Sequence, residues 1–190
     1  MTPTRLNALT DGVVAIVLTI MVLELKVPAE PTLQAALAVL PLLAAYLLAF
    51  VNVAIYWNNH HHMMQSAHKV TGAVLWANHA LLFCLTLFPL MIRWIDEAGI
   101  TSWPVASFGL VLVGASWSYY GLERALIAAE GDGSSVKKAL GRSRKEWLSF
   151  SLYIVSVPAA FVSPLVSIAI IVGVSLMWLV PDRRFEKSQI

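Results

Sequence analysis

The sequence predicts an all-α integral membrane protein, a single domain over residues 1–190 with six transmembrane helices. Hydrophobic residues make up 58% of the chain, charged residues make up 13%, and the mean hydropathy is +0.73. A soluble domain averages about 45–50% apolar and about 25% charged residues. No segment shows the period-2 alternation of a membrane β-barrel strand. Composition and length therefore indicate one helical domain in a bilayer.

Six apolar segments reach the length of about 17–25 residues that a helix needs to cross a bilayer. The predicted helices cover, in order, residues 6–25, 33–57, 70–93, 103–128, 147–163 and 165–181. Only Ser163-Pro164 separates the last two, which predicts a tight helical hairpin. For the first segment a cleavable signal peptide is the alternative, but Asp11 at its head and Glu24-Leu-Lys26 at its tail favour a retained helix.

The lysine and arginine residues predict the orientation in the membrane. With six spans, both termini and the loops at 58–69 and 129–146 share one side, which carries all of the 13 basic residues except Lys26 and Arg93. The basic residues on that side are Arg5, Lys69, Arg124, Lys137, Lys138, Arg142, Arg144, Lys145, Arg183, Arg184 and Lys187. This bias predicts a multi-pass protein of the cell inner (plasma) membrane with cytoplasmic N- and C-termini. The charges indicate contact with anionic membrane lipid and no nucleic acid.

The cluster His60-His61-His62 is the first candidate for a functional site. Metal ligands on one helix usually lie three or four residues apart, whereas consecutive histidines point in different directions. We therefore predict no metal site and no cofactor. The sequence has no glycine-rich phosphate loop and no carboxylate pair at mid-membrane, so an enzyme is not expected. His79, inside the third segment, comes nearest to the position that a proton-coupled transporter needs.

The first helix carries an apolar stripe behind a polar head. Ile16, Ile20 and Leu23 follow i, i+4, i+7 spacing and share one face, with Thr19 beside them. From periodicity alone, packing against neighbouring helices is favoured over a role in a pore. The polar residues before the stripe are Arg5, Asn7, Thr10 and Asp11, and their expected partners are Trp57, His60, His61, Asn78 and His79. The hydrocarbon core offers such polar groups nothing else to bond to.

The segment Arg5-Leu-Asn-Ala-Leu9-Thr10-Asp11 resembles the Arg-x-x-x-Phe-Ser-Asp motif that opens the transmembrane protein 175 family. These are the lysosomal-type potassium channels, with many bacterial members. The likeness continues over residues 12–25, reappears in Tyr56-Trp57-Asn-Asn-His60-His61 and in residues 76–89, and so covers the first half of the chain. Leu9 and Thr10 stand where the family has Phe and Ser. The threonine keeps the hydroxyl, but the aromatic packing is lost.

The resemblance implies a homotetramer of six-helix subunits whose first helices surround a central cation pore. Carried over by position, Ile16, Ile20 and Leu23 would form apolar rings that constrict the pore, and Thr19 a hydroxyl ring where K+ pauses. Such a constriction replaces a carbonyl filter, so the preference for potassium over sodium and other monovalent cations should be modest. The residues implied to lock the pore helix against the second and third helices are Arg5, Thr10, Asp11, Trp57, His60, His61, Asn78 and His79.

Three functions are open at this stage. The first is a potassium-preferring channel that conducts passively through a hydrophobic constriction. The alternative is a proton-linked transporter or proton pathway that uses His79 and the His60–His62 cluster. The third is a non-conducting membrane scaffold in which the apolar stripe of the first helix only packs.

Overall fold

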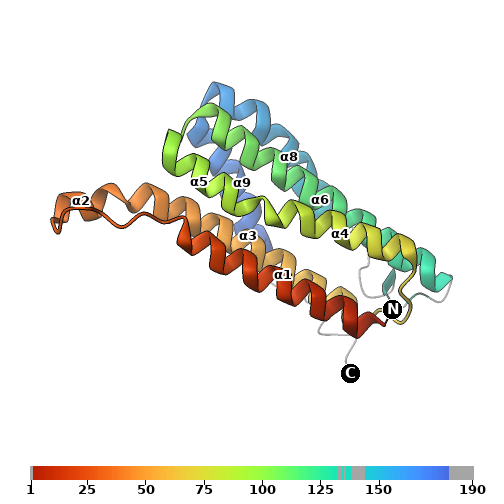
Figure 1. Ribbon diagram of the computed structural model, residues 1–190. Helices are drawn as coiled ribbons and strands as arrows, with labels where there is room; N and C mark the ends of the chain where they lie inside the picture. The colour runs from red at the N-terminus through yellow and green to blue at the C-terminus, as the bar shows by residue number, and fades with distance from the viewer. Residues whose placement is uncertain (1, 132–133, 135, 138–143, 180–190) are drawn as a thin grey trace.

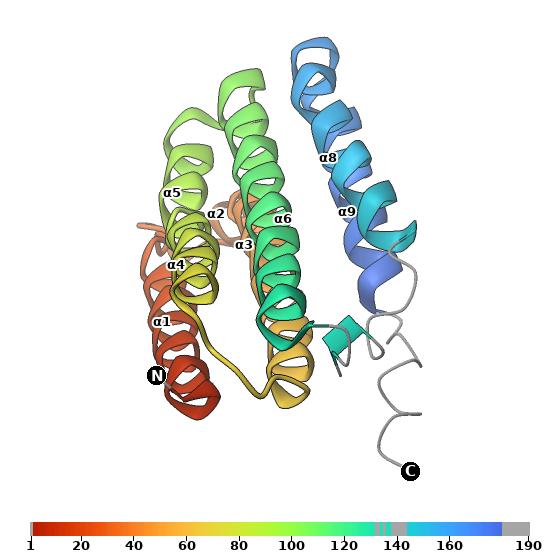
Figure 2. The ribbon, with the colours of Figure 1, turned by 90° about the vertical axis from the view of Figure 1, so that its right-hand side faces the viewer.

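The computed structural model describes residues 2–131, 134, 136–137 and 144–179. Within these ranges all regular secondary structure is helical, and the long helices run side by side in an elongated bundle (Figure 1). The all-α fold is therefore confirmed. The N-terminus lies at the same end of the bundle as the C-terminal end of α6 (Ser102–Glu130), as Figure 2 shows.

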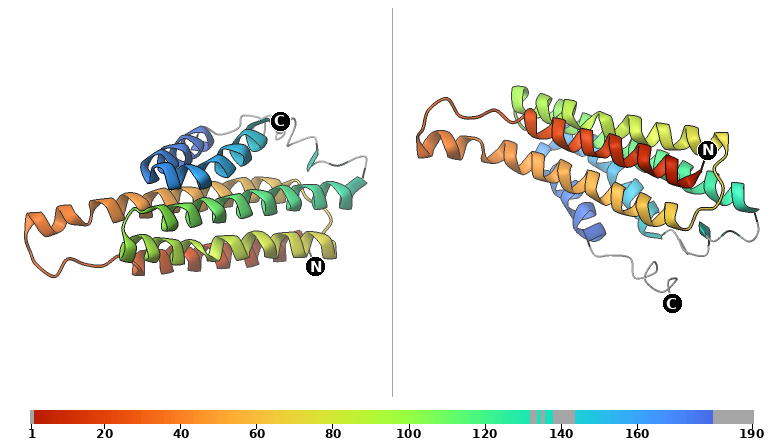
Figure 3. Two further views of the ribbon diagram at one scale, coloured as in Figure 1. Left: turned by 90° about the horizontal axis from the view of Figure 1, so that it is seen from above. Right: turned by 60° about the horizontal axis from the view of Figure 1, so that its bottom comes forward.

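The helices form three layers of neighbours. Figure 3 shows α1 (Pro3–Leu23) beside α4 (Gly72–Thr86) and α5 (Phe88–Ala98) in one layer. The next layer holds α6 and α3 (Leu40–Gln65), and the third holds the hairpin of α8 (Arg144–Val162) and α9 (Pro164–Leu179). The middle layer is therefore covered on both sides, while α1 and the hairpin form the two outer surfaces.

A polar cap and a proline fix the start of α1. The Thr2 hydroxyl accepts a hydrogen bond from the backbone N of Arg5 at 3.4 Å, which satisfies one of the free N–H groups of the first turn. Pro3 occupies the first turn, where its missing N–H is not needed. The buried residues of the helix are Leu6, Thr10, Val14, Val17 and Met21, which recur at helical spacing and face α3 and α4.

Proline interrupts the second predicted segment. Where the sequence predicts one helix over residues 33–57, a short α2 (Leu33–Ala38) precedes the long α3, and Pro41 lies in the first turn of α3. A proline ring clashes with the carbonyl four residues earlier, which ends the preceding helix. Figure 1 shows α2 projecting beyond the rest of the bundle. At its other end α3 continues to Gln65, so the histidine cluster belongs to a helix.

The same effect divides the segment predicted over residues 70–93 into α4 and α5. Pro89 lies in the first turn of α5, and the two helices follow one another along one line in Figure 1. Together they are long and apolar enough to form one membrane span. Gly99 ends α5 with a φ of +73°, a left-handed backbone conformation that favours glycine.

Close approach of helices depends on glycine at one position of α6. A Cβ added at Gly109 would lie 2.9 Å from Ser156 Oγ and 3.3 Å from Val157 Cγ2, both on α8. Those distances are shorter than normal van der Waals contact. The hairpin of α8 and α9 therefore packs against α6 at a separation that a larger residue at this position would disturb.

Four stretches of the described residues are long and apolar enough to cross a membrane, namely Pro3–Leu23, Leu33–Gln65, Gly72–Ala98 and Ser102–Glu130. α9 is a shorter apolar helix that pairs with α8. These helices make the chain a multi-pass membrane protein. Among the basic residues that predict its orientation, Lys138, Arg142, Arg183, Arg184 and Lys187 lie outside the described residues. The last two residues of the segment predicted over 165–181 lie outside them as well.

Candidate functional site

Helix α1 has one face that its subunit covers and one that it leaves uncovered. The covered face is centred on Thr10 and Val17, which are 1% and 2% exposed. On the other face Ile16 is 59% exposed, Ile20 is 41% exposed and Leu23 is 80% exposed. Thr19 is exposed on that same face. The four residues expected to line a pore thus share the face of α1 that the subunit leaves exposed.

The Thr19 hydroxyl is already bonded to its own helix. Its Oγ1 donates a hydrogen bond to the Ile16 carbonyl oxygen at 2.9 Å. The proton of the hydroxyl is therefore directed along α1, and the lone pairs of the oxygen are directed away from that carbonyl. An oxygen with this orientation can accept from a water or coordinate a cation that passes along the exposed face.

A buried chain of hydrogen bonds joins α1, α3 and α4. Asn78 Nδ2 donates to Thr10 Oγ1 at 3.1 Å, and His60 Nε2 lies 2.9 Å from Asn78 Oδ1. Because a carboxamide oxygen can only accept, His60 carries its proton on Nε2. All three side chains are at most 1% exposed. Leaving any of these groups unpaired in an apolar interior would cost free energy. The hydrogen bonds between them therefore fix the rotation of α1 about its axis.

A second contact holds α1 against α3 nearer the surface. Trp57 Nε1 donates to Asp11 Oδ1 at 2.8 Å, and Asn7 Nδ2 donates to Asp11 Oδ2 at 3.3 Å. The ring of His61 stacks on Trp57 with a centroid distance of 5.7 Å, and His61 Nε2 lies 2.8 Å from Gln65 Nε2. Both oxygens of the Asp11 carboxylate are therefore occupied by donors within the subunit.

Two residues of the expected polar lock lie outside it. Arg5 is exposed, and within the described residues its guanidinium has no hydrogen bond or ion pair. His79 is also exposed, and its Nδ1 lies 2.6 Å from the Leu75 carbonyl oxygen of its own helix. His79 is adjacent in sequence to Asn78, but a step of about 100° along a helix turns it away from α1. The lock therefore consists of Thr10, Asp11, Trp57, His60 and Asn78, with His61 stacked on it.

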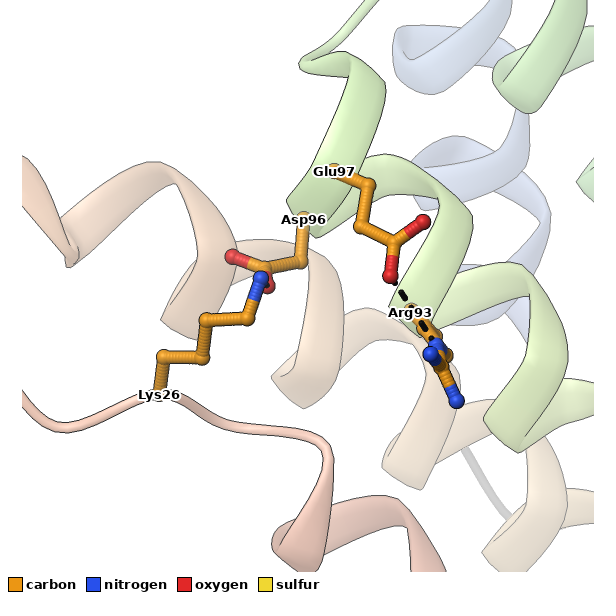
Figure 4. A network of polar contacts seen from close by, with 4 residues as sticks. All are labelled: Lys26, Arg93, Asp96 and Glu97. Atoms are coloured by element: carbon orange, nitrogen blue, oxygen red, sulfur yellow. Dashed lines mark hydrogen bonds and ion pairs between the residues drawn. The ribbon is translucent and has the colours of Figure 1, made fainter.

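The opposite end of α1 is attached through the loop that follows it. Lys26 Nζ forms an ion pair with Asp96 Oδ2 of α5 at 2.6 Å, and beside it Arg93 Nε pairs with Glu97 Oε1 at 3.0 Å (Figure 4). The hydrogen bond to Asp96, and then the charge of that carboxylate, raise the pKa of Lys26 above its ordinary value. The stabilisation by this pair is therefore present at neutral pH and is lost as the pH rises through the raised pKa.

A further polar network, which sequence analysis did not single out, joins α3 to the hairpin of α8 and α9. Asn52 Nδ2 donates to Ser175 Oγ at 3.0 Å, and Tyr153 Oη donates to Asn52 Oδ1 at 3.2 Å. All three residues are buried. The signal in the sequence is Asn52 itself, an amide in the middle of an apolar span, where polar residues need an internal partner.

The described residues contain no group of three His, Cys, Asp or Glu side chains that could share a metal ion. His60 points into the subunit toward Asn78, and His61 stacks on Trp57. What the geometry of α1 provides is an oriented helix with an uncovered face that carries three apolar residues and one hydroxyl group.

The sequence of this chain is similar to those of known potassium channels. Residues 5–89 match the family described as endosomal/lysosomal potassium channel TMEM175. A protein from Chryseobacterium sp. named as a potassium channel is 43% identical over 188 residues, which are 99% of this chain and 98% of that protein. A potassium channel from Streptomyces collinus is 28% identical over 126 residues, which are 62% of this chain and 61% of the relative.

A solved structure matches the fold over nearly the whole chain. It is the crystal structure of a lysosomal potassium-selective channel TMEM175 homolog from Chamaesiphon minutus, with a TM-score of 0.80 and 21% sequence identity. The match covers 93% of this chain and 96% of that one. At 21% identity, this match shows that the two chains share the same arrangement of helices.

Proposed function

This chain belongs to the TMEM175 family of potassium channels, and we propose that it conducts potassium passively through a pore lined by the exposed face of α1. Membership in the family makes it a transport protein and not an enzyme. The proposed assembly is a homotetramer with the four copies of α1 around its axis, in the plasma membrane, with both termini in the cytoplasm.

The observation that carries the proposal is the uncovered face of α1. At about 100° per residue, Ile16, Thr19, Ile20 and Leu23 lie about 80–180° around the helix from Thr10. The contacts of Thr10 with Asn78, and of Asp11 with Trp57, bind the other side of α1 to α3 and α4. The lock therefore sets the rotation of α1, and that rotation directs the apolar stripe away from its own subunit.

Rings of isoleucine and leucine make the proposed constriction hydrophobic. Passage through such a ring depends on its width and on whether water fills it. An ion must shed part of its hydration shell there, and potassium does so more readily than sodium. The ring of Thr19 hydroxyl groups gives a partly dehydrated cation oxygen atoms to contact, so we propose a site for K+ beside it and a modest preference for potassium over sodium and other monovalent cations.

The alternative, a proton pathway through His79 and the histidine cluster, has less support in the geometry. His79 bonds to the Leu75 carbonyl oxygen of its own helix, and His60 bonds to Asn78. The hydrogen bonds of the described residues do not connect these two histidines. Asn78 bridges α4 and α3, but its amide is neither an acid nor a base, so a proton relay from His60 to His79 would need a further group.

Potassium flux from liposomes tests the proposal. Substitution of Ile16 by Asn adds a polar amide to the constriction, which should wet it and raise the flux. The matched control is Leu110→Asn, because Leu110 is 62% exposed but lies on α6 and not on α1. The control should conduct as the unmodified protein does. The pore assignment fails if Ile16→Asn leaves the flux unchanged while His79→Ala abolishes it, and that outcome would favour the proton pathway.

A further inference from the structure

A cavity of about 60 Å³ lies between α3, α6, α8 and α9, and no residue of α1 is among the described residues that line it. Among the described residues, 13 line it and eight of these are aromatic, including Tyr153, Trp147 and Trp178. Glu146 is the single acidic residue of those 13. An aromatic wall with one carboxylate is the composition of the sites that bind ammonium groups in proteins.

Two rings of this wall already contact cations of the chain itself. Lys145 Nζ lies 4.4 Å from the centroid of the Trp178 ring, and Arg124 Cζ lies 5.8 Å from that of Tyr120. The face of an aromatic ring carries negative electrostatic potential, which attracts a cation within about 6 Å of the centroid. Two of the rings that line the cavity therefore already make contacts of the kind that an ammonium ligand would make.

A second acidic residue lies close to the first. Glu123 on α6 is only 3% exposed, and it lies near enough to Glu146 on α8 for the two carboxyl groups to interact electrostatically. A monovalent cation in the cavity would lie next to Glu146, which lines it.

The size and polarity of the cavity select among cations. One water needs roughly 10–15 Å³ of such space, so the cavity holds a group of about four to six heavy atoms. That is the size of a trimethylammonium or similar alkylated ammonium group. Alkali metal ions prefer oxygen ligands, whereas the surface that the cavity exposes is mostly apolar.

We propose that this aromatic cavity binds an alkylated ammonium group, either of a free amine or of a choline-type lipid headgroup. The ligand reaches it from the surface of the molecule, because Trp117 and Trp147 line the cavity and are also 58% and 50% exposed. The site uses no residue of the exposed face of α1. A test of this site therefore does not depend on whether the proposed pore exists.

Binding of radiolabelled choline to the full chain in detergent tests the proposal. The competitor 3,3-dimethyl-1-butanol has the shape of choline without its charge, so it should displace choline roughly 3- to 30-fold less well than unlabelled choline does. Trp178→Leu and Glu146→Gln should each weaken choline binding by a similar factor, about 3- to 30-fold. Trp103→Leu is the control, because Trp103 is exposed and packs on Phe161 away from the cavity.

Binding in lipid nanodiscs distinguishes a lipid headgroup from a free amine as the source of the ammonium group. If the site takes a lipid headgroup, choline binds more weakly in phosphatidylcholine nanodiscs than in phosphatidylglycerol nanodiscs. If it takes a free amine, the two affinities agree. The proposal is overturned if the unmodified protein binds no displaceable choline, if the neutral analogue competes equally, or if Trp178→Leu binds choline as the unmodified protein does. The competition between charged and neutral ligands uses the unmodified protein, so it does not depend on the folding of any variant.

Discussion

The indole nitrogen of Trp57 donates a 2.8 Å hydrogen bond to the carboxylate of Asp11 and thereby joins the middle layer of the bundle to the head of α1. An aspartate near the end of a membrane span is a candidate for a cation-binding group. Here both of its oxygens accept hydrogen bonds inside the subunit, from Trp57 and from Asn7. Asp11 therefore helps to orient α1. An ion would instead contact the exposed face of that helix.

Substitution of Trp57 by Phe tests this contact. An aromatic ring remains, but the indole N–H donor is lost. The Asp11 carboxylate then loses one partner, and the protein should lose roughly 1–2 kcal/mol of unfolding free energy. Denaturation followed by fluorescence or circular dichroism measures the change. Trp76→Phe is the control, because Trp76 is 79% exposed on α4. Equal stability of the two variants would show that the bond to Asp11 contributes nothing.

A double-mutant cycle between Thr10 and Asn78 tests the buried part of the lock. Asn78→Leu should cost roughly 2–4 kcal/mol, because the Thr10 oxygen loses its donor and the His60 N–H loses its acceptor in an apolar interior. The Thr10 hydroxyl keeps its own hydrogen bond to the Leu6 carbonyl oxygen. Thr10→Val in the Asn78→Leu background should cost less than Thr10→Val alone, since its partner is already gone. Additive changes in unfolding free energy would contradict the contact.

Gly109→Ala should destabilise the packing of the hairpin on α6. The new methyl group would lie 2.9 Å from Ser156 Oγ and 3.3 Å from Val157 Cγ2, and overpacking of this kind costs roughly 1–3 kcal/mol. Gly121→Ala in the same helix is the matched control, because an added Cβ there meets nothing within 4 Å. Thermal unfolding of the two variants should differ, with Gly109→Ala the less stable. Identical midpoints would mean that α6 and α8 are farther apart than described.

Thr19→Val tests whether the hydroxyl contacts the permeant ion. The change keeps the shape of the side chain and removes its oxygen, so the ratio of potassium to sodium flux should fall about 2- to 10-fold, the value of one neutral hydrogen bond. Thr86→Val is the control. Thr86 on α4 has the same local geometry, with its hydroxyl bonded to the Phe83 carbonyl oxygen at 2.7 Å, but it lies off α1. A flux ratio that is unchanged by Thr19→Val would show that the Thr19 hydroxyl does not contact the permeant ion.

Composition and hydropathy were enough to predict the helical membrane fold, because a chain this apolar and this poor in charge has few other ways to fold. The helix breaks at Pro41 and Pro89 could also have been predicted, since each proline prevents the preceding helix from continuing. The predicted segments crossed both positions because hydropathy alone is continuous there.

The sequence could not show which of the polar side chains meet. His60 and His79 look alike as histidines near or within apolar helices, yet His60 is buried against Asn78 while His79 bonds to its own helix. That difference depends on the rotation of α3 and α4 relative to α1, which is set by packing across the whole bundle. The bond between Asn52 and Ser175 spans 123 positions in the sequence and carries no local pattern that could pair them.

A structure of the assembled protein in lipid would show whether α1 lines a pore. We expect four subunits around one axis, with α1 nearest to that axis and the Ile16 side chains turned toward it from the face that the isolated subunit leaves uncovered. A different helix at the axis, or an Ile16 side chain directed at lipid, would contradict this expectation.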